Sequence, residues 1–209
     1  MAVVIGSGIA VRAAGTAAVD RGADQALAKA RHFTGYRLFY LGPQFEGYDL
    51  SDVGRELVPP AYHRVVDRLP RVRVPRFDFI YGSCTPSGGS GGEGGTCVLP
   101  IQLQNDGACA LHPHSIARPT RRLMVRGVPA QLYSDHGAFD QLVLFTRTTT
   151  ITIFDARGLQ AALHVAQRLR SLDATIEGGA PLPKPTRAGL EGRLRCQSSG
   201  RPTQRVAGR

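Results

Sequence analysis

Cysteine and histidine side chains are the residues of this 209-residue chain best suited to chemistry. Cys84, Cys97, Cys109 and His112 follow one another with twelve, eleven and two residues between them. Structural zinc sites usually take their ligands in close pairs, because one tight turn then fixes two ligands at once. Only Cys109 and His112 have that spacing, so we expect no metal ion. These four residues are the candidate ligands of an alternative interpretation, a zinc-binding protein or a Cys/His-dependent enzyme using residues 84–114.

The segment from Cys84 to Cys97 is a loop made mostly of glycine and serine, CTPSGGSGGEGGTC. A phosphate-binding loop of this composition ends in Gly-Lys-Ser/Thr and runs into a helix. Here Glu93 lies inside the loop, and the residues after Cys97 alternate in the manner of a strand. The loop therefore does not predict a phosphate site, and we expect no cofactor.

Alternating residues on both sides of this loop predict two antiparallel strands that meet at its base. A flexible tip would let the Cα atoms of Cys84 and Cys97 approach the ~5.5 Å that a disulfide requires. We predict that disulfide, which would stabilise the fold by roughly 3 kcal/mol through loop closure. Cys109 is the alternative partner of Cys84, and Cys196 has no expected partner. A disulfide indicates an oxidising compartment.

The residue patterns typical of hydrolases are incomplete in this sequence. Ser134, Asp135 and His136 are consecutive, whereas a catalytic triad needs side chains that converge in space. The chain has no G-x-S-x-G nucleophile motif. Cys109 with His112 or His136 is the remaining arrangement, and no motif surrounds it. We therefore expect no catalytic residue.

The net charge of +10 is concentrated at the C-terminus. Residues 181–209 carry +6, which leaves +4 for the first 180 residues. Such a tail attracts any polyanion without sequence preference, so non-specific polyanion binding is a second alternative function. Two groups of arginines outside the tail are candidate anion-binding residues: Arg71 and Arg73, and then Arg118, Arg121 and Arg122.

Hydrophobic periodicity predicts the elements that would position these residues. A helical stripe covers residues 23–33, and a second one covers residues 159–172. A period of two marks the strands between them, with Phe77, Phe79 and Tyr81 on one face. A short helix is expected after residues 59–60. The expected strands include residues 36–41, 48–53, 141–145 and 150–154.

These elements predict an α+β fold: an antiparallel β-sheet meander of about six to eight strands, with an N-terminal and a C-terminal helix packed on one face. We expect a linker or remnant of a signal or anchor segment at residues 1–21, one domain at residues 22–176 and a disordered basic tail at residues 177–209. The apolar run at residues 2–11 is far shorter than the ~20 residues that span a bilayer. It also lacks the basic start of a signal peptide.

Three segments within residues 33–173 carry a family resemblance: GYRLFYLGPQFEGYDL, VRGVPAQLYS and LVLFTRTTTITIF, the last leading into the second helix. In these segments the chain resembles uncharacterised extracytoplasmic domains of unknown function from Gram-positive bacteria, especially actinobacteria. The resemblance implies a location in the cell envelope and brings no catalytic residue with it.

These observations predict a non-catalytic extracytoplasmic domain that serves in binding or regulation at the bacterial cell envelope. Its expected partner is an envelope protein, an anionic polymer or lipid headgroups, and no specific nucleic acid. We expect a secreted or envelope-associated protein if the true start of translation lies upstream, and a cytoplasmic one otherwise. The sequence contains no expected transmembrane helix.

Overall fold

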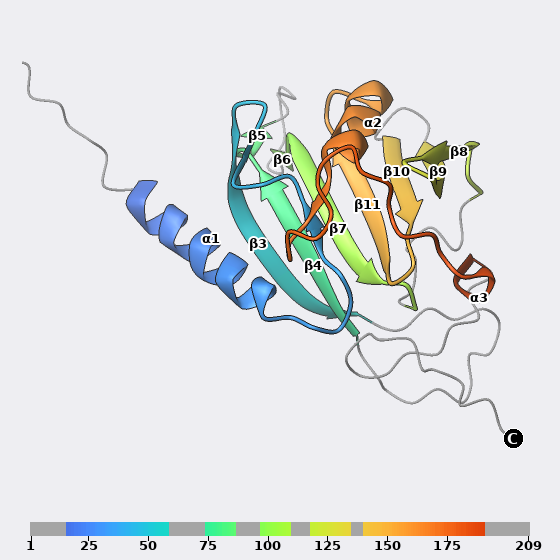
Figure 1. The fold of residues 1–209 in the computed structure, drawn as a ribbon. Coiled ribbons are helices and arrows are strands. Elements are labelled where there is room, and N and C mark those ends of the chain that lie inside the picture. Colours follow the sequence, from blue (N-terminus) through green and yellow to red (C-terminus); the bar gives the residue numbers. More distant parts are fainter. Residues whose placement is uncertain (1–15, 59–73, 87–96, 110–117, 135–139, 191–209) are drawn as a thin grey trace, which may run out of the picture.

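A computed structural model describes residues 16–58, 74–86, 97–109, 118–134 and 140–190 of the chain (Figure 1). Within these ranges the protein has an α+β fold built on an eight-stranded antiparallel sheet, with strand order β2-β3-β4-β7-β11-β10-β9-β8. Two short two-stranded sheets, β1-β12 and β5-β6, accompany it.

The helices of the described residues are α1 (Thr16–Arg31), α2 (Leu159–Arg168) and the single turn α3 (Arg187–Leu190). The strands are β1 (Phe39–Tyr40), β2 (Gln44–Phe45), β3 (Tyr48–Val58), β4 (Val74–Tyr81), β5 (Thr85–Pro86), β6 (Cys97–Val98), β7 (Ile101–Gly107), β8 (Arg121–Val125), β9 (Val128–Ser134), β10 (Asp140–Phe145), β11 (Thr149–Asp155) and β12 (Arg170–Ser171).

The large sheet is not the simple meander that the sequence predicts. Strands β2 to β4 lead to β7, and strands β8 to β11 return from the far edge, so that β11 pairs with β7. This order places β11 at the centre, where Ile151 and Ile153 are fully buried. Central placement suits this strand because β-branched side chains pack well on a sheet that is covered.

One face of the sheet carries the hydrophobic core. Phe77, Phe79 and Tyr81 share this face, as their alternation predicts, and all three are buried. Side chains from α1 and α2 join the same core cluster, with α1 against β3 and α2 against β10 and β11. Phe33, just after α1, packs against Phe77 with ring centroids 4.9 Å apart and ring planes tilted by 49°.

The segment expected as a strand over residues 36–41 crosses the core face instead of joining the large sheet. Only Phe39 and Tyr40 form a strand, which pairs with β12. Side chains of the large sheet take the place of a neighbouring strand: Asn105 binds the backbone of Phe39, and the Tyr81 hydroxyl accepts the Leu41 N–H at 2.8 Å.

The ends of the domain differ from the expected boundaries. Helix α1 begins at Thr16, inside the predicted linker. At the other end, Leu182 is buried and its N–H donates to the Arg126 carbonyl at 2.9 Å. The segment that follows residue 176 therefore packs on the domain, and the predicted start of the tail at residue 177 is wrong. Residues 191–209 lie outside the described residues, as does the helix expected after residues 59–60.

None of the helices in the described ranges combines the length and the apolar character needed to cross a bilayer.

Candidate functional site

The candidate zinc ligands Cys84 and Cys109 lie at opposite ends of the sheet. Cys84 follows the end of β4, whereas Cys109 follows the end of β7, and these strands are antiparallel neighbours. The seven residues from Ile101 to Gly107 separate the two levels by about 20 Å. Cys84 and Cys109 therefore cannot bind the same metal ion. His112 lies outside the described residues, and no other group of metal-ligating side chains occurs within them.

The glycine-rich loop begins and ends on the short hairpin β5-β6. Its register pairs Pro86 with Cys97, so Cys84 lies two residues before the position opposite Cys97. Cys84 and Cys109 are both disulfide-bonded. Their positions at opposite ends of the sheet exclude a bond between them, so the alternative pairing considered from the sequence is wrong. The Cys84–Cys97 pairing stays a prediction, because the side chain of Cys97 lies outside the described residues.

Mass spectrometry of protease-digested, non-reduced protein should find the Cys84 peptide linked to the Cys97 peptide. Because the chain has four cysteines, this bond would leave Cys196 as the partner of Cys109. The matched control is the same digest after reduction, in which all four peptides should appear singly. A peptide joining Cys84 to Cys196 would contradict the predicted hairpin disulfide.

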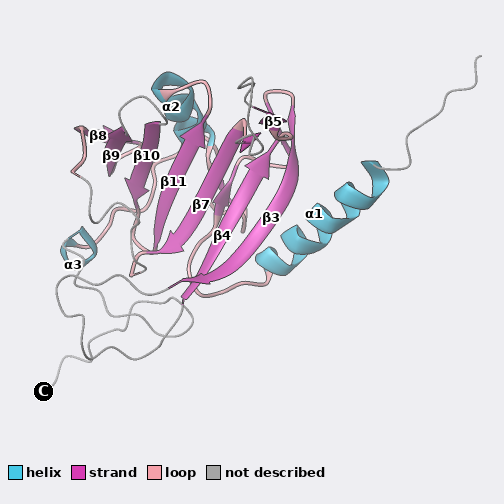
Figure 2. Ribbon diagram, turned by 180° about the vertical axis from the view of Figure 1, so that it is seen from behind, coloured by secondary structure: helices cyan, strands magenta, loops and turns pink. Residues whose placement is uncertain are grey.

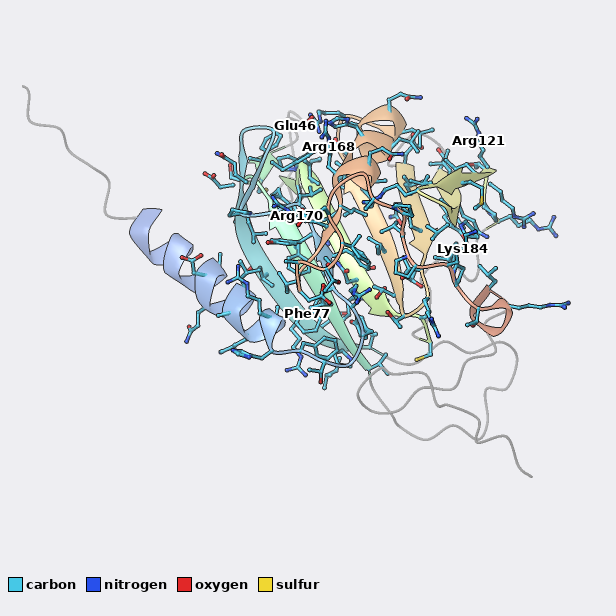
Figure 3. All side chains as sticks on the ribbon, viewed as in Figure 1. Glu46, Phe77, Arg121, Arg168, Arg170 and Lys184 are labelled. Carbon is cyan, nitrogen blue, oxygen red and sulfur yellow. The ribbon has the colours of Figure 1, made fainter. Side chains whose placement is uncertain are left out.

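Among the described residues, the predicted anion-binding arginines do not converge with other elements on a common binding site. Arg118, Arg121 and Arg122 are exposed at the edge strand β8, and Figure 3 shows Arg121 at the outer margin of the sheet. The recess beside them is lined only by residues 118–122. Arg71 and Arg73 lie outside the described residues. In the hydrolase-like sequence Ser134 ends β9 and is exposed, and Asp135 and His136 also lie outside the described residues.

A cluster of hydrogen-bonding side chains occupies the other face of the sheet, which Figure 2 views from the side opposite α2. We call this surface the polar face and define it by residues at alternate positions of three neighbouring strands. Strand pairing places these residues in rows that run across β4, β7 and β11. The polar face consists of Arg76, Asp78, Gln102, Gln104, Asp106, Thr150 and Thr152.

The first row is a charged network around Arg76. Its guanidinium contacts the Asp106 carboxylate at 2.7 Å and Glu56 on β3 at 3.2 Å. Asp106 is fully buried, and this burial raises the pKa of its carboxyl to about 6 although Arg76 opposes the shift. Buried carboxylates need such a partner, because an unpaired charge in the interior is costly.

The second row centres on Asp78, which has amide partners instead of a cation. The Nε2 atoms of Gln104 and Gln102 donate to Asp78 Oδ1 at 3.2 and 3.3 Å. Burial raises the pKa of Asp78, and the two amide hydrogen bonds oppose that shift. Register then continues the row from Gln104 to Thr152 on β11.

The side chain of Thr152 has an oxygen atom that forms no hydrogen bond with the described residues. The residue is 7% exposed, and its Oγ1 atom is buried without a hydrogen-bond partner among the described residues. A buried hydroxyl without a partner costs roughly 1–3 kcal/mol, so native proteins rarely retain one without a reason. The polar face thus combines two carboxyl groups of raised pKa with an unsatisfied hydroxyl, features that gather at binding sites.

The Asp106 carboxyl should make the free energy of unfolding depend on pH, and Asp106→Asn should lack this contribution. Its folded-state pKa of about 6 lies above the ordinary value of 3.8, so the folded protein binds more protons between these values. Stability should therefore fall as pH rises through 6. Between pH 5.0 and 7.5 wild type should lose roughly 1 kcal/mol more than Asp106→Asn, measured by urea unfolding. Equal losses in the two proteins would contradict the raised pKa.

The polar face was missed in the sequence, although its signal was present. The segments RFDFIY and IQLQND have apolar residues at alternate positions, and these residues lie on the core face. Their intervening positions hold Arg, Asp and Gln, which an exposed face also favours. Only strand pairing shows that these residues form continuous rows with Thr152, since β11 lies about 45 residues further along the chain.

No protein-family model, curated protein or solved structure matches this chain.

Proposed function

We propose that this protein is a non-catalytic binding domain of the bacterial cell envelope, and that its ligand lies on the polar face of the sheet while α1 and α2 pack against the opposite face. The observation that carries the proposal is the buried Thr152 hydroxyl, which has no partner among the described residues. A ligand that binds it would recover a hydrogen bond that the described protein does not supply. Rigid strands hold the surrounding groups in place, which lowers the entropic cost of binding.

Binding is favoured over catalysis by the way the charged groups are used. Arg76 is held by Asp106 and Glu56, and Asp78 is held by two glutamine amides. The described part of this face offers carboxylate, amide and hydroxyl groups but no cysteine or histidine nucleophile. An extracytoplasmic location is part of the proposal and is supported by the disulfide-bonded state of Cys84 and Cys109.

Chemical-shift mapping tests where the domain binds. The full chain, labelled with ¹⁵N, would be titrated separately with soluble peptidoglycan fragments, an anionic polymer and anionic lipid vesicles. Amides of β4, β7 and β11 should shift with at least one of these, and Thr152→Val should weaken that response. Shifts confined to β8 and its arginines would contradict a site on the polar face.

Non-specific polyanion binding by the tail is the second candidate function, motivated by its charge. Because residues 177–183 pack on the domain, the informative truncation removes residues 191–209 and keeps the domain intact. The comparison is made with disulfides reduced in both proteins, because the truncation also removes Cys196. Under these conditions it should abolish low-salt affinity for heparin and leave urea unfolding unchanged. If the truncated protein still binds heparin in low salt, the tail is not the polyanion-binding element.

A further inference from the structure

The polar face has the opposite charge to the protein as a whole. On β3, β4 and β7, the side of the sheet that bears the polar face carries four acids and one cation, whereas the chain has a net charge of +10. The acids are Asp52, Glu56, Asp78 and Asp106, and the cation is Arg76. Register places Asp52 and Glu56 on this face, opposite Ile80 and Arg76. A phosphate, a sulfated polymer or an anionic headgroup would be repelled here.

The hydrogen-bonding capacity that remains on the polar face requires a ligand that both donates and accepts. Gln102 and Gln104 direct their NH₂ groups to Asp78, which turns their carbonyl oxygens away from that carboxylate. These carbonyls and Asp78 Oδ2 accept hydrogen bonds, and the Thr152 hydroxyl can donate or accept. In the described structure none of these four oxygen atoms has a further partner.

A cationic ligand satisfies only part of this set. An ammonium or guanidinium group could donate to Asp78, but it would approach Arg76, which occupies the next row of the same strand. The charges of Asp106 and Glu56 are already compensated by Arg76. A cation also accepts no hydrogen bond. Hydroxyl groups can serve the carboxylate, the amide carbonyls and the threonine alike.

The dimensions and the neighbouring side chains suit a ligand with several hydroxyl groups. Asp78, Gln104 and Thr152 lie side by side on adjacent strands, so their row extends about 10 Å. Ile80 and Phe154 flank Gln102 in the adjacent row and are half-buried. Such side chains offer apolar contact to the C–H surfaces of a ring, while the row of polar atoms fixes its orientation.

We propose that the polar face binds an uncharged saccharide, through hydrogen bonds from its hydroxyl groups to Asp78, Gln104 and Thr152. This inference rests on the proposed binding function and specifies its ligand class. It concerns the polar face alone and is independent of the arginines of β8.

Calorimetric titration of the full chain with three neutral oligosaccharides, chitotetraose, cellotetraose and maltotetraose, tests this inference. At least one should bind, and Thr152→Val and Gln104→Leu should each lower its affinity about tenfold, the effect of one hydrogen bond. Thr152→Val should keep the fold, because it removes an unsatisfied polar atom and preserves the shape. Gln44→Leu is the matched control on the exposed edge strand β2 and should leave affinity unchanged.

Tetralysine and heparin serve as the cationic and anionic probes in parallel titrations. Chemical shifts of ¹⁵N-labelled protein locate any binding. Tetralysine binding that shifts β4 and β7 amides, without binding of any oligosaccharide, would overturn the saccharide inference and leave the proposed binding function standing. Heparin binding on the polar face would overturn the charge argument. If neither the oligosaccharides nor the two charged probes perturb the polar face, both the inference and the proposed site are wrong.

Discussion

Replacing Asn105 with leucine is expected to lower the free energy of unfolding by about 4 kcal/mol. Asn105 is fully buried, and its Oδ1 atom accepts the Phe39 N–H at 2.8 Å while its Nδ2 donates to the Phe39 carbonyl at 3.0 Å. Leucine would leave both backbone groups of a buried residue without these partners. Each unsatisfied group costs roughly 1–3 kcal/mol, and urea unfolding measures the sum.

Gln104→Leu is the matched control for this experiment. Gln104 precedes Asn105 on β7, but its side chain lies on the polar face and is half-buried. Its replacement should cost less than about 1 kcal/mol, because the site can be rehydrated. If the two variants lose equal stability, the specific role of Asn105 is refuted.

Asn105→Asp separates hydrogen bonding from packing, because it keeps the shape of the side chain. An ionised carboxylate cannot donate to the Phe39 carbonyl and would be buried without a cation. Protonation would restore the donor, so this variant should recover stability as pH falls from 7 to 5. Asn105→Leu should show no such recovery beyond the pH dependence of wild type.

Loss of the Arg126 side chain should have the second largest effect, about 3 kcal/mol. Arg126 donates to the carbonyls of Ala180, Leu169 and Glu177 at 2.5, 2.5 and 2.8 Å, and to Ala166 at 3.3 Å. One guanidinium thus joins the end of α2 to the segment that follows residue 176. Hydrogen bonds to a charged group contribute about 1.5–3 kcal/mol each when partly buried, and water would replace some of them in a variant.

Arg126→Gly is the informative substitution because of the backbone at this turn. Arg126 has a φ of 49° and precedes Gly127 with a φ of 81°, in the two-residue connection between β8 and β9. Glycine adopts this conformation readily, so the variant removes the guanidinium without adding backbone strain. Thermal unfolding should show a lower Tm, and hydrogen exchange should show faster exchange of the Leu182 amide.

Arg168→Ala is the control for Arg126, since both arginines lie near the end of α2 but Arg168 is exposed (Figure 3). Its removal should change stability by less than about 0.5 kcal/mol. Arg126→Lys keeps the charge but cannot reach four carbonyls, so it should recover only part of the loss. Full recovery of stability in Arg126→Lys would show that the positive charge alone stabilises this segment, and that the several N–H donors of the guanidinium are not needed.

Several elements were correctly predicted because short-range physics determines them. The alternation around Phe77, Phe79 and Tyr81 identifies a strand with one buried face, and the structure buries all three residues. The hairpin of residues 141–145 and 150–154 appears as β10 and β11. Periodicity also identifies α2, although the helix ends at Arg168 because Leu169 has an extended backbone, with a ψ of 134°.

The errors concern contacts between residues distant in the chain. The sequence suggests a strand over residues 36–41, yet this segment is anchored by Asn105 and Tyr81, about 70 and 40 residues away. It also suggests a disordered chain after residue 176, because glycine and proline interrupt any period there. The Arg126 hydrogen bonds and the burial of Leu182 hold that segment in place, and neither can be recognised from local composition.

By itself, the sequence determined the element types, the core face and the α+β class, because side-chain periodicity fixes which face of each strand or helix is apolar. Tertiary structure alone decided the strand order, the separation of Cys84 from Cys109 and the polar face. The physical reason is that pairing β7 with β11 joins residues about 45 positions apart, and a strand's own pattern specifies its faces but not its neighbours. That pairing places Thr152 beside Gln104 and so creates the candidate site.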